Sequence, residues 1–285
     1  ITVMRDGYAI SSKPTRETNM EQVVRDMVGR SITEYYPGRT NEPGEIVLEV
    51  KNFCQDGLFN NISFKLRKGE ILGVAGLMGA GRTEIMRALF GVDSCKHGEV
   101  YLHGKKVCIK KPEDAIKAGI GFITENRKSE GLILDFSISR NIALPSVDTF
   151  AKRSVINAKN ETAFSEALSK KLGVKTASID LEAGALSGGN QQKVVIAKWI
   201  GMNPSIIIMD EPTRGIDVGA KRDIYDLMNE LTSQGVAIIM VSSELPEVIG
   251  MSDRILVIHE GKIAGELDHE EATQEKIITL ATGGQ

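Results

Sequence analysis

The run from Leu186 to Asp217, LSGGNQQKVVIAKWIGMNPSIIIMDEPTRGID, constrains the fold more than any other part of the chain. A glycine-rich loop with a hydroxyl group opens a predicted helix. The apolar run Ile206 to Met209 then predicts a short strand buried in a parallel sheet. Asp210 and Glu211 follow at the carboxyl end of that strand, where open α/β sheets place their ligands. The run therefore predicts an α/β protein with nucleotide chemistry.

The loop at the start of this run has the chemistry of an anion site. The backbone N–H groups of Gly188 and Gly189 and the Ser187 hydroxyl lie at a helix N-terminus. Unpaired donors and the helix dipole favour a phosphate there. A glycine turn followed by a solvated acid pair is the structural alternative for either half of the run. The two halves together favour phosphate binding.

A second phosphate-binding pattern lies upstream. Glu70 to Phe90, EILGVAGLMGAGRTEIMRALF, reads as an apolar strand, a glycine-rich loop and an amphipathic helix. Gly76 to Thr83 fits the phosphate-loop pattern, except that Arg82 stands where the pattern has lysine. A guanidinium is planar and larger than the compact ammonium that reaches the β- and γ-phosphates. We therefore expect binding to survive this change while hydrolysis suffers.

Three further side chains complete the predicted nucleotide site. The Thr83 hydroxyl and the Asp210 carboxylate are predicted to hold Mg²⁺, and Glu211 is the candidate general base for the attacking water. For Arg82, the alternative is a surface arginine that caps a glycine turn. The residues predicted to bind the nucleotide are Gly76, Gly79, Ala80, Gly81, Arg82, Thr83 and Glu84.

With these motifs the chain resembles an ATP-binding cassette domain, a P-loop NTPase. The segments that carry a closer resemblance, to the carboxy-terminal cassette of bacterial monosaccharide importer ATPases of the ribose type, are GLMGAGRTE, ITENRKSEGL, LSGGNQQK, DEPTRGIDVGAK and VSSELPEV. The resemblance covers essentially the whole chain. It implies an α/β fold with a mainly parallel core sheet, an antiparallel β-layer and a helical subdomain. It also implies ATP and Mg²⁺ as cofactors.

The resemblance also assigns roles to residues. The signature loop, which in such proteins contacts the γ-phosphate of ATP held by the opposing cassette, is matched by Leu186, Ser187, Gly188, Gly189, Asn190 and Gln191. Gly215 to Asp217 match a loop that communicates across the cassette interface. Ser243 stands where a switch histidine is usual, and Glu125 stands near the usual glutamine. Together with Arg82, these departures imply a pocket that binds ATP and turns it over poorly. This chain's signature loop would complete a hydrolytic site in trans.

The ring that stacks on adenine is not evident from the sequence. The segment from Asn52 to Asn61 is short, and it offers Phe53 and Phe59 as candidates. For both rings, packing in the core is the favoured interpretation.

The first residues of the chain repeat the last ones. Ile1 to Arg30 aligns without a gap to Ile255 to Gly284, at a constant separation of 254 residues. Gly7 thereby matches Gly261, Glu21 matches Glu275, and Gly29 matches Gly283. A repeat of this length predicts tandem cassettes, with chance similarity as the alternative. Residues 1–30 are interpreted as the closing strand, turn and helix of a preceding cassette. Because the chain begins with isoleucine, we expect it to be a piece of a longer protein.

The rest of the chain is predicted to form one domain after a linker. Residues 31–45 are rich in proline, glycine and charge and read as the linker. Residues 46–285 form the predicted second nucleotide-binding domain, with a helical subdomain at about residues 130–185. Within it, Ile138 to Leu172 shows helical periodicity. By resemblance, the groove between this arm and the Glu125 loop receives a coupling helix of the membrane permease, although helix packing alone would give the same periodicity.

Composition narrows the possible partners. A net charge of −3 and a pI near 5.9 give no basic face of the kind that nucleic-acid binders need, so no nucleic acid is expected. No apolar run approaches the roughly 18 residues of a membrane span, so membrane contact must come through partners. Cys54, Cys95 and Cys108 lack paired spacing and are expected to be free thiols.

The resemblance implies an energy-coupling ATPase subunit at the cytoplasmic face of the bacterial inner membrane. The implied partners are the amino-terminal cassette of the same chain, a transmembrane permease and, indirectly, a periplasmic sugar-binding protein. The alternative is a non-hydrolytic regulatory nucleotide-binding cassette. Glu211 favours hydrolysis, whereas Arg82 and Ser243 favour regulation. A soluble cassette ATPase of translation or DNA repair is disfavoured by the sugar-importer motifs and the acidic balance.

Overall fold

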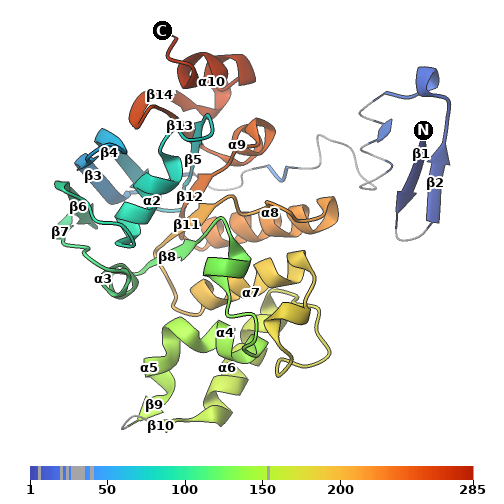
Figure 1. The fold of residues 1–285 in the computed structure, drawn as a ribbon, viewed down its shortest axis with the longest axis vertical. Helices are drawn as coiled ribbons and strands as arrows, with labels where there is room; N and C mark the ends of the chain where they lie inside the picture. Colours follow the sequence, from blue (N-terminus) through green and yellow to red (C-terminus); the bar gives the residue numbers. More distant parts are fainter. Residues whose placement is uncertain are drawn as a thin grey trace.

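The computed structural model describes residues 1–5, 8–19, 22, 23, 26, 36–38, 42–152 and 155–284. Its main body contains a six-stranded sheet, a four-stranded antiparallel sheet and a helical subdomain (Figure 1). A hairpin formed by β1 (Thr2–Arg5) and β2 (Tyr8–Ser12) lies to the side of this body. These parts confirm the expected α/β fold with its β-layer and helical arm.

The six-stranded sheet forms the centre of the main body, with the order β14-β13-β5-β12-β11-β8. All neighbouring strands are parallel except β13 and β14, so an antiparallel strand closes one edge. Every residue of β8, β11 and β12 is buried. Strands covered on both faces read as continuous apolar runs, which explains their sequences. The strands are β5 (Ile71–Gly76), β8 (Ile120–Ile123), β11 (Ile206–Asp210), β12 (Ala237–Val241), β13 (Arg254–His259) and β14 (Lys262–Asp268).

Helices cover this sheet, and the loops that connect strands to helices form the candidate site (Figure 1). The helices that pack against the sheet are α2 (Arg82–Phe90), α3 (Pro112–Lys117), α7 (Gly188–Ile200), α8 (Val218–Ser233), α9 (Leu245–Met251) and α10 (Gln274–Ala281). Three of them, α2, α8 and α9, follow the carboxyl ends of β5, β11 and β12 directly. Among the described residues, no helix has the length and apolar content needed to cross a membrane.

The four-stranded sheet is the expected antiparallel layer, with the order β4-β3-β6-β7. Buried and exposed residues alternate along β4, as they do when one face of a sheet packs on a core and the other meets water. The strands are β3 (Ile46–Gln55), β4 (Phe59–Arg67), β6 (His97–Leu102) and β7 (Lys105–Val107).

The helical subdomain is less continuous than the periodicity of Ile138 to Leu172 predicts. Pro145 follows the first helix, and a two-residue-per-strand hairpin, β9 (Ala151–Lys152) and β10 (Val155–Ile156), precedes the longest one. Proline lacks a backbone N–H, which explains the break after α4. The other elements are a π-helical turn η3 (Arg127–Gly131), α4 (Ile138–Ala143), η4 (Leu144–Ser146), α5 (Val147–Phe150), α6 (Ala158–Lys171) and η5 (Ala183–Ala185).

The amino-terminal hairpin has the same backbone pairing as the hairpin β13–β14. Thr2 pairs with Ser12 and Arg5 with Tyr8, whereas Leu256 pairs with Glu266 and His259 with Lys262, so each pair keeps the separation of 254 residues. The register shift also falls at equivalent places, after Val3 and after Val257. A 3₁₀ turn then follows each hairpin, namely η1 (Thr15–Glu17) and η6 (His269–Glu271).

The chain after each of these turns is also alike. The Asn19 side chain accepts a hydrogen bond from the backbone N–H of Gln22 at 2.7 Å. Thr273 accepts one from the N–H of Lys276 at 3.2 Å, where it caps α10. The predicted matches of Gly7, Glu21 and Gly29 lie outside the described residues.

Part of the predicted linker is fixed to the main body. The Tyr36 ring lies 5.3 Å from the Tyr225 ring of α8 and covers Gly250 of α9, where an added Cβ would lie 2.4 Å from the Tyr36 Cγ. The Asn229 amide of α8 donates to the carbonyl groups of Pro37 and Gly38 at 3.1 and 3.2 Å. Only glycine at position 250 admits the ring this closely.

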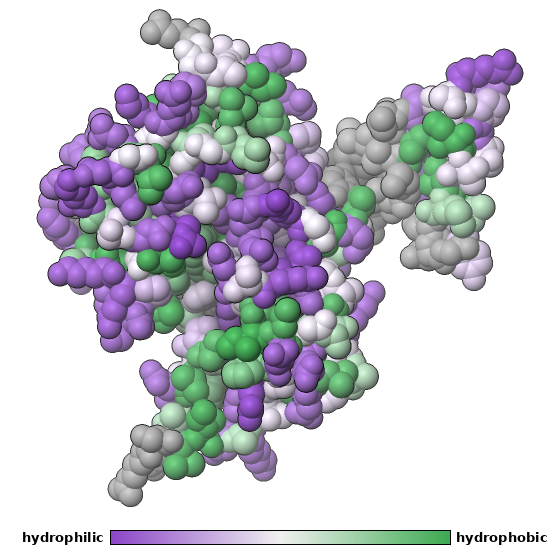
Figure 2. Space-filling view, viewed as in Figure 1, coloured by the Kyte–Doolittle hydropathy of each residue, from purple (hydrophilic) through white to green (hydrophobic). Residues whose placement is uncertain are grey.

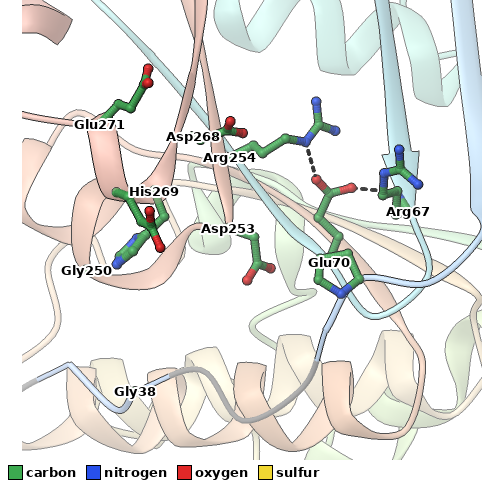
Figure 3. Close-up of a pocket in the computed structure, with 11 residues that line it drawn as sticks. Gly38, Arg67, Glu70, Gly250, Asp253, Arg254, Asp268, His269 and Glu271 are labelled. Carbon is green, nitrogen blue, oxygen red and sulfur yellow. Dashed lines mark hydrogen bonds and ion pairs between the residues drawn. The ribbon is translucent and has the colours of Figure 1, made fainter.

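A cleft of about 760 Å³ lies beside this linker segment. Figure 3 shows Gly38 on the segment that runs beside a helix, with Glu70 and Asp253 above it. Glu70 is fully buried, and its carboxylate accepts hydrogen bonds from Arg254 Nε at 2.6 Å and from the Arg67 N–H at 2.5 Å. Both Glu70 oxygens thus have protein donors, one on β4 and one on β13. Because Glu70 directly precedes β5, its carboxylate links these three strands and has a structural role.

Candidate nucleotide-binding site

A separate pocket of about 370 Å³ lies at the carboxyl ends of β5, β11 and β12. Loops that follow parallel strands meet at this edge, which is where ligands bind in open α/β sheets. Most of the predicted nucleotide-site residues come together here. The pocket is lined by Met78, Gly79, Ala80, Gly81, Arg82, Thr83, Glu84, Glu125, Glu211, Arg214, Ser243 and Glu244.

The predicted phosphate loop connects β5 to α2. Gly81 directly precedes the helix with φ of 99°, and an added Cβ would lie 3.3 Å from the Leu58 carbonyl oxygen. The positive φ and the close backbone together require glycine. The first turn of α2 therefore leaves its N–H groups at the pocket, an arrangement that suits phosphate.

Asp210 ends β11 beneath this loop and is 1% exposed. Neither of its carboxylate oxygens has a hydrogen-bond partner among the described residues. Burial raises the pKa of Asp210 to about 6, and the neighbouring Thr83 hydroxyl and Arg82 act in the opposite direction. A buried carboxylate with free oxygens beside a threonine hydroxyl fits the oxygen ligands that Mg²⁺ prefers.

Arg82 is directed at the carboxylate and carbonyl groups behind the pocket. Its Nη1 donates to the Ser242 carbonyl at 2.8 Å, and its Nη2 lies 4.0 Å from Glu211 Oε1. The Ser243 hydroxyl donates to Glu211 Oε2 at 3.1 Å. Burial raises the pKa of Glu211, opposed by the Ser243 hydrogen bond and by the Arg82 charge. The candidate base is thus oriented by serine and partly neutralised by arginine.

Glu125 lines the pocket and forms an ion pair with Arg214, which follows the acid pair in the chain. Both side chains are partly exposed, at 39% and 64%. An exposed pair of this kind contributes little to stability. It marks where the loops on either side of the pocket meet.

The family described as ABC transporter matches residues 59–214 of the chain. This chain belongs to the ABC transporter family. Its fold is also that of solved cassettes. MJ1267, an ATP-binding cassette of an ABC transporter, is 23% identical with a TM-score of 0.70, over 82% of this chain and 98% of that one. A dimeric post-hydrolysis state of the cassette MJ0796, bound to ADP and Pi, has a TM-score of 0.66 at 22% identity, over 78% of this chain and 98% of that one.

Curated relatives match along the full chain. The ribose import ATP-binding protein RbsA of Oceanobacillus iheyensis is 62% identical over 284 residues, which are 100% of this chain and 57% of the relative. The same-named protein of Bacillus subtilis is 61% identical over 285 residues, which are 100% of this chain and 58% of the relative. The cassette therefore spans little more than half the length of these relatives.

The loop predicted as the signature loop does not line the candidate nucleotide pocket. Ser187 is exposed and precedes α7, and its hydroxyl accepts a hydrogen bond from the Asn190 amide at 3.0 Å. Leu186 is partly buried against the core. Gln191 is 3% exposed, and its amide donates to the Ala183 carbonyl at 3.3 Å. Gln191 thus supports the loop from behind, whereas the N–H groups of Gly188 and Gly189 begin the helix as predicted.

Two groups that sequence reasoning did not identify hold the site's loops. Arg127 donates to the carbonyl groups of Arg214 and Gly215 at 2.7 and 3.1 Å. Glu247 of α9 is 1% exposed and accepts hydrogen bonds from Thr213 and Ser242. The only sequence signal for Glu247 is an acid within the apolar segment LPEVIGM. Neither contact is implied by spacing.

The two remaining predictions concern Asp217 and the adenine ring. Asp217 caps α8 by accepting from the Ala220 N–H at 3.0 Å, so it fixes the end of the loop assigned to interface communication. Phe53 and Phe59 are 4% and 3% exposed and stack on each other with centroids 5.6 Å apart. Core packing of both rings is thereby confirmed. The thiols of Cys54, Cys95 and Cys108 are free, also as predicted.

Proposed function

We propose that this cassette is the second of two in the ATP-hydrolysing subunit of a bacterial monosaccharide importer, with ribose as the sugar. The names and the full-chain identity of the relatives support the substrate class. The observation that carries the nucleotide role is the single pocket that gathers Arg82, Thr83, Glu211 and Ser243 beside the free carboxylate of Asp210.

The repeated unit at the amino terminus supports a tandem arrangement. The described residues within 1–19 share strand pairing, register shift and 3₁₀ turn with their counterparts in 255–273, and Asn19 and Thr273 each accept a hydrogen bond from the N–H three residues later. In the cassette, this unit completes the edge of the core sheet through pairing of β13 with β5. The amino-terminal copy is proposed to complete a preceding cassette in the same way, with residues 31–45 as the linker.

At the cassette's own pocket, the chain's residues have separate tasks. The N–H groups of the phosphate loop and the first turn of α2 bind the phosphates of ATP. Thr83 and Asp210 hold Mg²⁺, which screens the negative charge of the phosphate oxygens when it is bound. Glu211, which the Ser243 hydroxyl orients, takes a proton from the attacking water. Arg82, tied to the Ser242 carbonyl and close to Glu211, weakens that base, so slow turnover is expected here.

The signature loop is proposed to serve the other cassette. Its exposed Ser187 and the start of α7 at Gly188 and Gly189 lie outside the pocket of their own cassette. A helix N-terminus with an exposed hydroxyl suits the γ-phosphate of ATP bound elsewhere. The efficient hydrolytic site would then combine the phosphate loop of the amino-terminal cassette with this signature loop.

The permease is proposed to bind beside the helical subdomain. A cavity of about 320 Å³ lies between the end of α2 and α7, and its lining includes Phe90, Phe122, Lys198 and Trp199. Figure 2 shows apolar side chains gathered over the helical subdomain, where Ile133, Phe136 and Leu144 are exposed. Such a surface suits an apolar coupling helix. The cassette would thus act at the cytoplasmic face of the inner membrane, with the periplasmic sugar-binding protein as an indirect partner.

Binding and hydrolysis of MgATP by this chain test the proposal. We expect binding with slow turnover. Arg82→Lys should raise the rate severalfold, because a lysine ammonium leaves Glu211 less neutralised and reaches the phosphates. Glu211→Gln should lower the hydrolysis rate by about 10²-fold or more. Glu230→Gln, an exposed change of equal charge, is the control. Failure to bind MgATP would refute the nucleotide role, and fast hydrolysis by the unmodified chain would refute the weak site.

A regulatory cassette is the second candidate, and the contacts of Arg82 with the Ser242 carbonyl and Glu211 favour it. In that case ATP bound here would change hydrolysis at the other site without being consumed. In the longer protein, Glu211→Gln would then leave overall hydrolysis unchanged. Substitution of Thr83 by valine, which weakens Mg²⁺ binding, would lower it.

A further inference from the structure

A buried carboxylate behind the nucleotide pocket joins two of its loops. Thr213 Oγ1 donates to Glu247 Oε1 at 2.8 Å, and the Ser242 hydroxyl donates to Glu247 Oε2. Thr213 lies on the loop after β11, and Ser242 directly follows β12. Glu247 itself lies in the first turn of α9, which follows that second loop. One side chain therefore fixes the relative positions of two neighbouring strand ends.

The segment held by Glu247 is the one that contacts the reactive groups. The Ser242 carbonyl accepts from Arg82 Nη1 at 2.8 Å, and the next residue, Ser243, donates to Glu211 at 3.1 Å. The Ser242 hydroxyl also accepts from the Glu244 N–H at 3.1 Å. A shift of Ser242 would thus move two groups together, namely its own carbonyl, which binds Arg82, and the Ser243 hydroxyl, which orients Glu211.

A carboxylate is suited to this position by its two acceptor oxygens. A glutamine offers one acceptor oxygen and an NH₂ donor, so one of the two hydroxyls would lose its acceptor. Among the described residues, no salt bridge to Glu247 is found, so the hydroxyls supply its compensation. Burial raises the pKa of the Glu247 carboxyl, and the hydrogen bonds from the Ser242, Thr213 and Tyr225 side chains act in the opposite direction. A charge without a cation at this depth is costly for stability.

We propose that Glu247 is a positioning residue of this nucleotide site, which sets the Ser243 hydroxyl against Glu211 and the Ser242 carbonyl against Arg82. It does not line the pocket, so it acts only through the two loops. The role in turnover rests on the proposed function, because it requires MgATP to occupy the pocket. The role in ordering the loop does not.

A double-mutant cycle with Ser243 tests the step through which Glu247 acts. In single-turnover hydrolysis with protein in excess over MgATP, Glu247→Gln should slow the reaction about tenfold, a part of the roughly 10²–10⁴-fold that a positioned general base contributes. The Kd for MgATP should stay within about threefold. Ser243→Ala added to Glu247→Gln should cause little further loss, because both changes remove the same contact. Additive losses, or an unchanged rate, would overturn the proposal.

Hydrogen exchange of the Glu244 N–H without nucleotide gives a second test. Glu247→Gln should speed this exchange about tenfold or more, because the Ser242 hydroxyl that holds the N–H is released. Thr213→Val should have a smaller effect, and Glu230→Gln none. Thermal unfolding checks that each variant folds. An exchange rate unchanged by Glu247→Gln would refute the positioning role whatever the chain binds, whereas lack of MgATP binding by the unmodified chain would refute the proposed function.

Discussion

The hairpins β1–β2 and β13–β14 have the same pairing but different surroundings. Ile1 and Met4 are 49% and 65% exposed, whereas their counterparts Ile255 and Ile258 are 0% and 2% exposed. β13 pairs with β5 and packs against α10, but β1 pairs only with β2 among the described residues. Local sequence therefore determines strand register and turn. The neighbouring strand determines the burial of Ile255 and Ile258, whereas Val3 and its counterpart Val257 are buried in both hairpins. The tandem proposal explains why Ile1 and Met4 are exposed whereas their counterparts in β13 are buried.

The largest difference in unfolding free energy between the two hairpins is expected when aspartate replaces Ile258 or its counterpart, Met4. Ile258→Asp should lower the free energy of unfolding by about 4 kcal/mol or more, because it buries an unpaired carboxylate beside β5. Met4→Asp in this chain should change it by less than about 0.5 kcal/mol, because Met4 meets water. Urea unfolding followed by circular dichroism measures both. Equal losses would contradict the comparison.

The same Met4→Asp change sharpens the comparison in the longer protein. If residues 1–30 complete a preceding cassette, Met4 becomes buried there. The variant should then destabilise the amino-terminal half by about as much as Ile258→Asp destabilises this cassette. Met4→Leu, which keeps the apolar character, is the matched control. If Met4→Asp leaves the stability of the amino-terminal half of the longer protein unchanged, the tandem assignment is refuted.

A smaller effect is expected at the positions of Gly265 and Ser11. An added Cβ at Gly265 would lie 2.8 Å from Leu280 Cδ1, so Gly265→Ser should cost about 1–3 kcal/mol by overpacking α10. At the matching position, Ser11 already has a hydroxyl that donates to Asp26 at 2.5 Å. Ser11→Gly should cost less than about 1 kcal/mol in global unfolding. Chemical denaturation of the two variants compares these sites directly.

The smallest effect is expected at the helix caps. Thr273→Ala should cost about 1 kcal/mol, because the N–H of Lys276 loses its acceptor. Asn19→Ala removes the same contact from Gln22, but among the described residues β1 and β2 pair only with each other, so the global unfolding free energy should not change. Amide exchange at Gln22 should nevertheless become faster. A loss of global stability with Asn19→Ala would show coupling between the two regions.

Much of the core fold follows from the sequence, because strand, loop and helix there are local patterns. The run Ile206 to Met209 is a buried strand, the phosphate loop precedes a helix, and the repeat at the amino terminus folds as its counterpart does. The helical arm was predicted less well, since periodicity continues across Pro145 and does not reveal the short hairpin after it.

The candidate site shows where sequence reasoning ends. The motif predicts that Arg82, Thr83 and Glu211 share a pocket, and they do. It does not predict that Arg82 reaches a carbonyl 160 residues away, since that contact depends on how β5 and β12 pair. Glu247 was missed for the same reason, because its partners belong to two loops brought together only by the sheet.

The attachment of Tyr36 to α8 and α9 changes the reach of the linker. Attachment to the main body therefore begins at Tyr36, ten residues before Ile46, where the first strand of the cassette begins. A shorter tether confines its two ends to a smaller volume, which raises the effective concentration of one relative to the other. Release of Tyr36 would dilute the amino-terminal unit around the cassette without breaking any bond in the chain.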